Sequence, residues 1–197
     1  MALRGRGISD NAVLRAMELV DRKHFVRKED WPVAYEAQSL PLACGQSLSE
    51  PLTIALMCQI AGLSRDHKLL EIGVGSGYQT AILSKIVTRV YAVERYKTLI
   101  SDAEDRFKTL AIQNIVIRHG DGRYGWKGQA PFDRIILGCA CLAPPQMLLD
   151  QLASGGRLVA VIDGQLMTFD KARTNITERE IMPLSLDTIE AGKSHTI

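Results

Sequence analysis

A glycine-rich stretch in the middle of the chain limits the possible fold more than any other feature. It reads Leu69-Leu70-Glu71-Ile72-Gly73-Val74-Gly75-Ser76-Gly77-Tyr78. Residues 68–72 suit a short buried strand, and residues 78–86 suit the helix that follows. The glycines between them allow a tight turn with positive φ and let a ligand approach the backbone closely. The stretch therefore predicts a strand, a glycine loop and a helix whose first N–H groups suit a polar or anionic group.

The spacing of the glycines indicates the kind of ligand. A dinucleotide fingerprint has the spacing Gly-x-Gly-x-x-Gly, whereas Gly73, Gly75 and Gly77 give Gly-x-Gly-x-Gly. This spacing disfavours a nicotinamide oxidoreductase. Glu94 ends the next apolar run, residues 90–93, and a carboxylate at the carboxyl end of a strand can accept both hydroxyls of a ribose. We expect a nucleoside ligand such as S-adenosylmethionine, the alternative being a glycine turn with no ligand.

The rest of the chain alternates between the two kinds of element. Helices are expected over residues 10–20, 51–62, 98–110 and 146–152, with Asp10 and Ser49 as N-caps of the first two. Strands are expected over 90–93, 114–118, 133–137 and 157–162, and an antiparallel pair over 165–169 and 177–184. This order predicts an α/β fold: a doubly wound, mostly parallel, Rossmann-like sheet with helices on both faces and an antiparallel C-terminal edge.

Length and composition suit one globular domain. The 197 residues are enough for a full core. We expect an N-terminal helical segment at 1–62, a ligand-binding core at 63–163, and the antiparallel edge and tail at 164–197. The net charge of +2 does not favour nucleic acid or a membrane surface. No apolar run is long enough to cross a bilayer, and residues 1–7 lack the apolar segment of a signal peptide. A cytoplasmic location is expected.

The cysteines indicate neither a metal site nor a redox site. Cys44, Cys58, Cys139 and Cys141 form no Cys-x-x-Cys pair. Cys139 and Cys141 would share one face of an extended segment, but no second pair of ligands accompanies them. We expect four free thiols and no bound metal.

Several motifs together resemble one enzyme family. The matching pieces run in family order from about residue 4 to about residue 165. They include Arg6-Gly7-Ile8-Ser9-Asp10, His24-Phe25-Val26, Gly45-Gln46-Ser47-Leu48-Ser49, the loop 71–80, Val93-Glu94-Arg95, His119-Gly120-Asp121-Gly122 and Ala130-Pro131-Phe132-Asp133. The chain resembles the protein-L-isoaspartate O-methyltransferases, S-adenosylmethionine-dependent enzymes with the class I methyltransferase fold. The block at 45–49 is the most specific piece, because methyltransferases at large do not share it.

The resemblance implies an activity and a set of site residues. The activity is methyl transfer to the free α-carboxylate of an L-isoaspartyl residue in damaged proteins, and the ester then collapses to a succinimide. Ser49 falls on the active-site serine of the family, and Ser47 on the neighbouring hydroxyl. The cofactor residues that it implies are Gln46, Glu71, Gly73, Val74, Gly75, Ser76, Gly77, Glu94, Arg95, Gly120, Asp121 and Gly122. Partners would be damaged peptides and proteins, with no nucleic acid or membrane, and the chain would act as a monomer.

The expected chemistry needs few catalytic groups. A carboxylate has a solution pKa near 4 and is already a nucleophile at neutral pH, so no general base is required. The sulfonium donor is already activated. The remaining task is to align the reactants and remove water from the carboxylate, and the hydroxyls of Ser47 and Ser49 can orient it. The structural alternative for Ser49 is a plain helix cap.

Three departures from the family pattern keep a second function open. Cys139-Ala140-Cys141 stands where the family usually has three alanines, and Asp163-Gly164-Gln165 replaces a glycine-rich segment. The tail after Met182-Pro183-Leu184 is short and matches weakly. The alternative is an S-adenosylmethionine-binding relative of the same fold with a different acceptor or a non-catalytic regulatory role.

Overall fold

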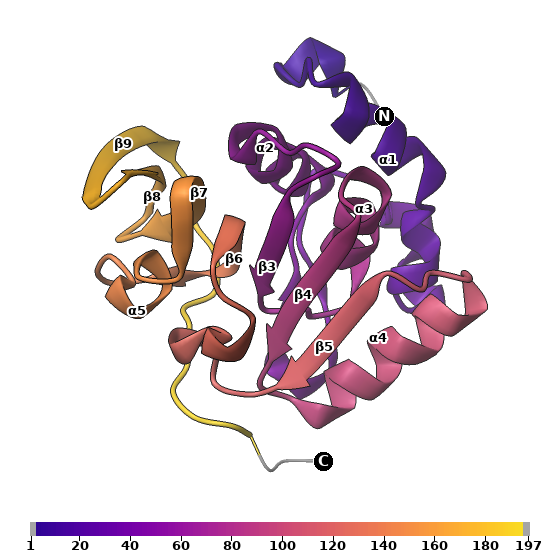
Figure 1. Ribbon diagram of the computed structural model, residues 1–197. Helices are drawn as coiled ribbons and strands as arrows, with labels where there is room; N and C mark the ends of the chain where they lie inside the picture. Colours follow the sequence, from indigo (N-terminus) through magenta and orange to yellow (C-terminus); the bar gives the residue numbers. More distant parts are fainter. Residues whose placement is uncertain (1–2, 195–197) are drawn as a thin grey trace.

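The computed structural model describes residues 3–194 and contains one large sheet with helices packed against it (Figure 1). The strand order is β5-β4-β3-β6-β7-β8-β9. The strands of this sheet are β3 (Lys68–Ile72), β4 (Arg89–Glu94), β5 (Ile115–His119), β6 (Phe132–Cys141), β7 (Leu152–Ile162), β8 (Gln165–Ala172) and β9 (Asn175–Pro183). The α-helices are α1 (Asn11–Leu19), α2 (Pro51–Ala61), α3 (Tyr78–Ile86), α4 (Lys97–Thr109) and α5 (Gln146–Leu149), and β1 (Leu40–Pro41) pairs with β2 (Ser47–Leu48).

The direction of the strands confirms the predicted fold class. Strands β3 to β7 pair in parallel, and β8 and β9 add antiparallel to the β7 edge. The chain runs outward from β3 to β4 and β5, then returns to place β6 on the other side of β3. The order therefore reverses between β3 and β6. In open α/β sheets this switch point, at the carboxyl ends of the strands, is where ligands bind.

Alternation along the strands builds two apolar layers. Leu69 and Ala92 belong to one core cluster, together with buried residues of α1, α2, α3 and α4. Leu70 and Phe132 belong to the other, with buried leucines of α5. Successive side chains of a strand point to opposite faces, so the sheet separates these layers. Helices lie on both faces as predicted, but the four long helices share one face.

Four local expectations differ from the structure. The N-cap of α2 is Glu50, with Pro51 as the first helical residue, so Ser49 lies one residue outside the cap position. Strand β6 continues through Cys141, beyond its expected end at residue 137, because it goes on pairing with β7 after a register shift. Helix α5 ends at Leu149, and β7 already begins at Leu152. Gly155 and Gly156 therefore lie within β7, which was expected to begin only at residue 157.

After β9 the chain crosses the carboxyl edge of the sheet as an extended segment, residues 185–194, which we call the C-terminal strap. Its middle is tied to β6: the Ala140 N–H donates to the Asp187 carbonyl at 2.8 Å, and the Ile189 N–H donates to the Ala140 carbonyl at 2.7 Å. Its far end is tied to the Arg95 carbonyl by the Ser194 N–H at 3.0 Å. The strap thus covers the end of the sheet where a ligand is expected.

Two general expectations bear on the described residues. The four cysteines are free thiols, as predicted. Within residues 3–194 there is no helix with both the length and the apolar character that a membrane crossing requires.

Candidate functional site

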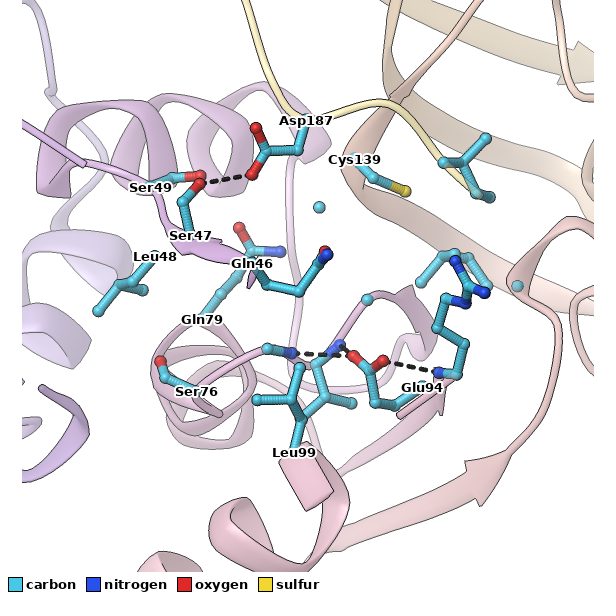
Figure 2. A pocket seen from close by; sticks show the side chains of 18 of the residues that line it. Gln46, Ser47, Leu48, Ser49, Ser76, Gln79, Glu94, Leu99, Cys139 and Asp187 are labelled. Atoms are coloured by element: carbon cyan, nitrogen blue, oxygen red, sulfur yellow. Dashed lines mark hydrogen bonds between the residues drawn. The ribbon is translucent and has the colours of Figure 1, made fainter. Parts of the chain in front are cut away.

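A pocket opens at the switch point, where the carboxyl ends of β3, β4 and β6 meet the C-terminal strap (Figure 2). It encloses about 870 Å³ of space, its open mouth included. Many of its lining residues match the sequence prediction: Gln46, Ser47, Ser49, Gly73, Val74, Gly75, Ser76, Glu94, Arg95 and Gly122. We call this the main pocket. The structure therefore brings the 45–49 block and the glycine loop to one cavity.

Four predicted cofactor residues do not line the main pocket: Glu71, Gly77, Gly120 and Asp121. Gly77 is the left-handed N-cap of α3, and a Cβ there would lie 2.8 Å from a ring carbon of Phe107, so its role is to let α3 and α4 pack closely. The Asp121 carboxylate pairs with Arg123 and accepts the Gly192 N–H at 2.8 Å. Asp121 therefore anchors the strap.

Glu94 acts as a clamp for the glycine loop. One of its carboxylate oxygens accepts the N–H groups of Val74 at 3.0 Å and Gly75 at 3.1 Å, and the other accepts those of Arg95 at 2.6 Å and Tyr96 at 2.9 Å (Figure 2). The side chain is only 5% exposed. The predicted ribose acid thus also holds the loop in its bent shape, a role that the sequence did not indicate.

Glu71 supports the pocket from behind. It is fully buried, and the Gln79 side chain, which does line the pocket, donates to one of its oxygens at 3.0 Å. Burial raises the pKa of the Glu71 carboxyl to about 8, against the smaller opposing effect of the Gln79 and Thr80 side chains. At neutral pH this carboxyl is therefore largely protonated and fixes the orientation of Gln79.

The raised pKa predicts a pH-dependent difference in stability. Between the ordinary value of 4.5 and about 8, the unfolded chain loses the Glu71 proton while the folded chain keeps it, so this group destabilises the fold increasingly as the pH rises. We expect Glu71→Gln to raise the melting temperature over wild type at pH 8, and the difference to shrink toward pH 5. Thermal unfolding at several pH values measures it. A difference that stays constant from pH 5 to 8 would contradict the assignment.

A polar recess adjoins the main pocket on the side of the 45–49 block. Its lining residues are Ser39, Ser47, Ser49, Gly138, Ser185, Leu186 and Asp187. We call it the acceptor recess. The Ser47 hydroxyl donates to an Asp187 carboxylate oxygen at 2.6 Å (Figure 2). Both predicted catalytic serines therefore face a space that joins the glycine-loop side, and Ser47 already has a partner.

The pocket-lining residues that lie far along the chain from the glycine loop were not predicted from the sequence. Asp187, Thr188, Ile189 and Glu190 of the strap line the main pocket, but the resemblance was weak beyond residue 165. Cys139 also lines it, and burial raises the pKa of its thiol far above the ordinary value, so it stays a neutral thiol at neutral pH. Gln79 could have been found, because it lies on the first turn of α3, directly after the loop.

The pocket suits a nucleoside with a polar tail. At Gly73 an added Cβ would meet nothing within 4 Å, so the loop backbone there is open to a ligand. Apolar side chains of Ile72, Val93 and Leu99 line the same cavity as the Glu94 carboxylate, which offers both a surface for a base and an acceptor for hydroxyls. Within residues 3–194, no group of three or more His, Cys, Asp and Glu side chains could hold a metal ion.

The parallel sheet, the glycine loop with its clamping acid and the pocket at the switch point define a class I methyltransferase. Residues 1–185 match the family described as protein-L-isoaspartate(D-aspartate) O-methyltransferase. The chain belongs to this family.

Curated relatives with this family name are similar over most of their length. The protein-L-isoaspartate O-methyltransferase of Maricaulis maris is 42% identical over 201 residues, which cover all of this chain and 94% of the relative. The relative from Azorhizobium caulinodans is also 42% identical, over 197 residues that cover 98% of this chain and 91% of the relative. That of Rhodospirillum centenum is 48% identical over 160 residues, 81% of this chain and 72% of the relative.

Solved structures confirm the fold. A protein-L-isoaspartate O-methyltransferase superposes with a TM-score of 0.86 at 24% identity, covering 96% of this chain and 64% of the other. A Plasmodium falciparum protein solved in complex with S-adenosyl-L-homocysteine gives a TM-score of 0.82 at 24% identity and covers 95% and 94% of the two chains.

Proposed function

We propose that the chain transfers a methyl group from S-adenosylmethionine to the free α-carboxylate of L-isoaspartyl residues in damaged proteins. The observation that supports this most directly is the placement of Ser47 and Ser49 in a recess that joins the glycine-loop pocket. The family-specific block and the general methyltransferase motif thus meet at one site. The cofactor, when bound, supplies an electrophilic methyl group on a sulfonium.

The residues of the main pocket divide the work of binding. Glu94 is proposed to accept the ribose hydroxyls while keeping the glycine loop bent. The backbone at Gly73 to Ser76 is proposed to lie against the methionine part, with Gln46 and Arg95 at the walls and Gly122 on the adenine side. Glu71 acts through Gln79, and Asp121 acts through the strap, so neither is proposed to touch the cofactor.

The acceptor side needs to orient a nucleophile that is already ionised. Ser49 is proposed to donate a hydrogen bond to one carboxylate oxygen and leave the other free to attack. The strap shields this side from water, since Asp187 lines both cavities and the following residues line the main pocket. Removing water from the carboxylate strengthens its interactions with the remaining donors.

A methyl-transfer assay with an isoaspartyl peptide and its aspartyl twin tests the function. We expect labelled methyl incorporation into the isoaspartyl peptide alone, and calorimetric binding of S-adenosylhomocysteine. Binding of the cofactor product without incorporation into either peptide would contradict the proposal. That result would favour the alternative of a same-fold protein with another acceptor or a regulatory role, for which the Asp187 carboxylate in the recess is the specific observation.

Asp187 gives a separate prediction about the acceptor. Its carboxylate places a negative charge next to the proposed site of an anionic substrate, and it accepts the hydrogen bond that the Ser47 hydroxyl could otherwise donate to that substrate. We expect Asp187→Asn to lower the KM for an isoaspartyl peptide by roughly threefold to tenfold, as one exposed like-charge repulsion is removed. Steady-state kinetics at low and high salt measure it, and high salt should reduce the difference. Asp66→Asn, which removes an exposed charge outside the pocket, is the matched control. A KM that rises in Asp187→Asn would show that Asp187 helps to bind the substrate.

The broader setting is also proposed. We infer that the protein acts as a monomer in the cytoplasm on damaged proteins, without nucleic acid or membrane partners. Residues 1–62 would serve the acceptor side, residues 63–163 the cofactor and residues 164–197 the edge and strap. Sedimentation of the purified protein with and without S-adenosylhomocysteine tests the monomer.

A further inference from the structure

The most unusual buried group outside the described cavities is a positive charge. Arg22 is fully buried and belongs to a 3-10 turn, Arg22–Phe25. None of the ion pairs among the described residues includes it. The neighbouring Asp21 carboxylate is already used, since it accepts the Tyr35 hydroxyl at 2.5 Å and the Lys23 N–H at 2.9 Å. A buried cation without a carboxylate partner lowers the stability of the fold, because its loss of hydration is not compensated. Its presence here therefore suggests a functional role.

The contacts of Arg22 place it between the two halves of the site. Its Nη2 donates to the Ser49 carbonyl at 2.8 Å, so the guanidinium lies directly behind the proposed acceptor residue. Its Cζ lies 4.9 Å from the ring centre of Tyr78, the first residue of the helix that follows the glycine loop. Its Nε and Nη1 have no partner among the described residues. Burial lowers the pKa of Arg22 to about 10, which still leaves it a cation at neutral pH.

The acceptor recess otherwise offers no positive charge. Its lining contains four serines and one carboxylate, Asp187, and no Lys, Arg or His. An acceptor carboxylate that enters it loses water and meets a like charge. The buried guanidinium behind Ser49 is screened less by salt than a surface charge would be, and a charge in a low-dielectric wall acts strongly on an ion in the adjoining space.

We propose that Arg22 is a positioning residue for the acceptor: its charge, held behind Ser49, favours an anionic acceptor over a neutral one, and its hydrogen bond fixes the Ser49 backbone. This inference rests on the proposed function. The unpartnered donors are then a feature of the site, because a carboxylate partner on Arg22 would cancel the charge that the acceptor needs.

The test compares two peptides that differ only in charge. One carries isoaspartate, and the other carries isoasparagine, in which a carboxamide replaces the free carboxylate. Their dissociation constants are measured by calorimetry with the full chain saturated with S-adenosylhomocysteine. We expect wild type to bind the isoaspartyl peptide about tenfold more tightly or better. Arg22→Gln keeps a polar side chain but removes the charge, and should reduce this preference to about threefold or less.

Three comparisons keep the result specific. Arg22→Lys keeps the charge and should restore most of the preference. Arg134→Gln is the matched control, because Arg134 also donates to a backbone carbonyl, that of Ala61 at 2.7 Å, but Ala61 lines neither cavity, whereas Ser49 lines both; it should leave the preference unchanged. The affinity for S-adenosylhomocysteine should change by less than about threefold in all variants.

Several results would overturn the proposal. An unchanged preference in Arg22→Gln, with or without an equal weakening of both peptides, would mean that Arg22 only supports the fold. Arg22→Met, which brings no polar atom that needs a partner, replaces Arg22→Gln if that variant does not fold. A wild-type protein that binds the two peptides equally overturns the proposal without any variant. Absence of turnover with an intact charge preference would instead contradict the proposed function.

Discussion

Ser49→Ala is expected to lower the methylation rate of an isoaspartyl peptide by roughly tenfold to a hundredfold. This matches the loss of a hydrogen bond to a charged group, about 1.5–3 kcal/mol. The helix cap that competed with this role is assigned to Glu50, so the substitution should cost less stability than the loss of an N-cap, about 1 kcal/mol. The substitution keeps the backbone carbonyl of residue 49, which accepts the hydrogen bond from Arg22.

Three measurements separate the roles of Ser49. Ser49→Thr keeps a hydroxyl and should be milder. Ser185→Ala removes another hydroxyl of the same recess and is the matched control. Calorimetry should show that the affinity for S-adenosylhomocysteine changes little in each variant. A rate within twofold of wild type together with a lowered melting temperature would return Ser49 to a structural role.

Glu94→Ala is expected to weaken binding of S-adenosylhomocysteine by roughly tenfold to a hundredfold and also to destabilise the protein. The first effect follows from the loss of a charged acceptor for the ribose hydroxyls, worth about 1.5–3 kcal/mol. The second follows because four backbone N–H groups lose their acceptor, and each donor left buried and unpaired costs on the order of 1–3 kcal/mol. Calorimetry well below the melting transition measures the first effect, and calorimetric melting measures the second.

Glu94→Gln sharpens this test. Its side-chain amide keeps the size of the carboxylate but turns one acceptor into a donor that faces backbone N–H groups. It should therefore destabilise the protein nearly as much as Glu94→Ala does. Glu104→Gln, on the exposed side of α4, makes the same chemical change outside the site and should have little effect. An unchanged dissociation constant in a folded Glu94 variant would show that the residue only clamps the loop.

Prediction from the sequence worked best where the structure is locally encoded. The bounds expected for β3 and α3 agree with the structure, because an apolar run, three closely spaced glycines and a helical period all lie within about twenty residues. Most of the predicted cofactor residues line one pocket, as expected from the rule that the carboxyl ends of parallel strands share an edge and from the family resemblance. The two-residue strands β1 and β2 carry no periodic signal, so the sequence did not indicate them.

Prediction worked less well where distant parts of the chain decide the structure. Serine is preferred over glutamate as an N-cap, yet α2 begins after Glu50, and Ser49 faces the cavities instead. The contact between Ser47 and Asp187 joins residues 140 positions apart. The pairing of the strap with β6 is a backbone interaction that no side-chain pattern announces. Nor did the sequence indicate that Arg22 is buried, because Arg22 lies in a charged stretch.

The C-terminal strap also couples the exchange of the two proposed ligands, because it forms part of both cavities. One continuous segment provides Asp187 to the acceptor recess and Thr188, Ile189 and Glu190 to the main pocket. Any lifting of the strap that frees the spent cofactor would therefore also open the acceptor recess. On that basis the methylated peptide is expected to depart before the cofactor product, so that one peptide does not stay bound through successive cofactors.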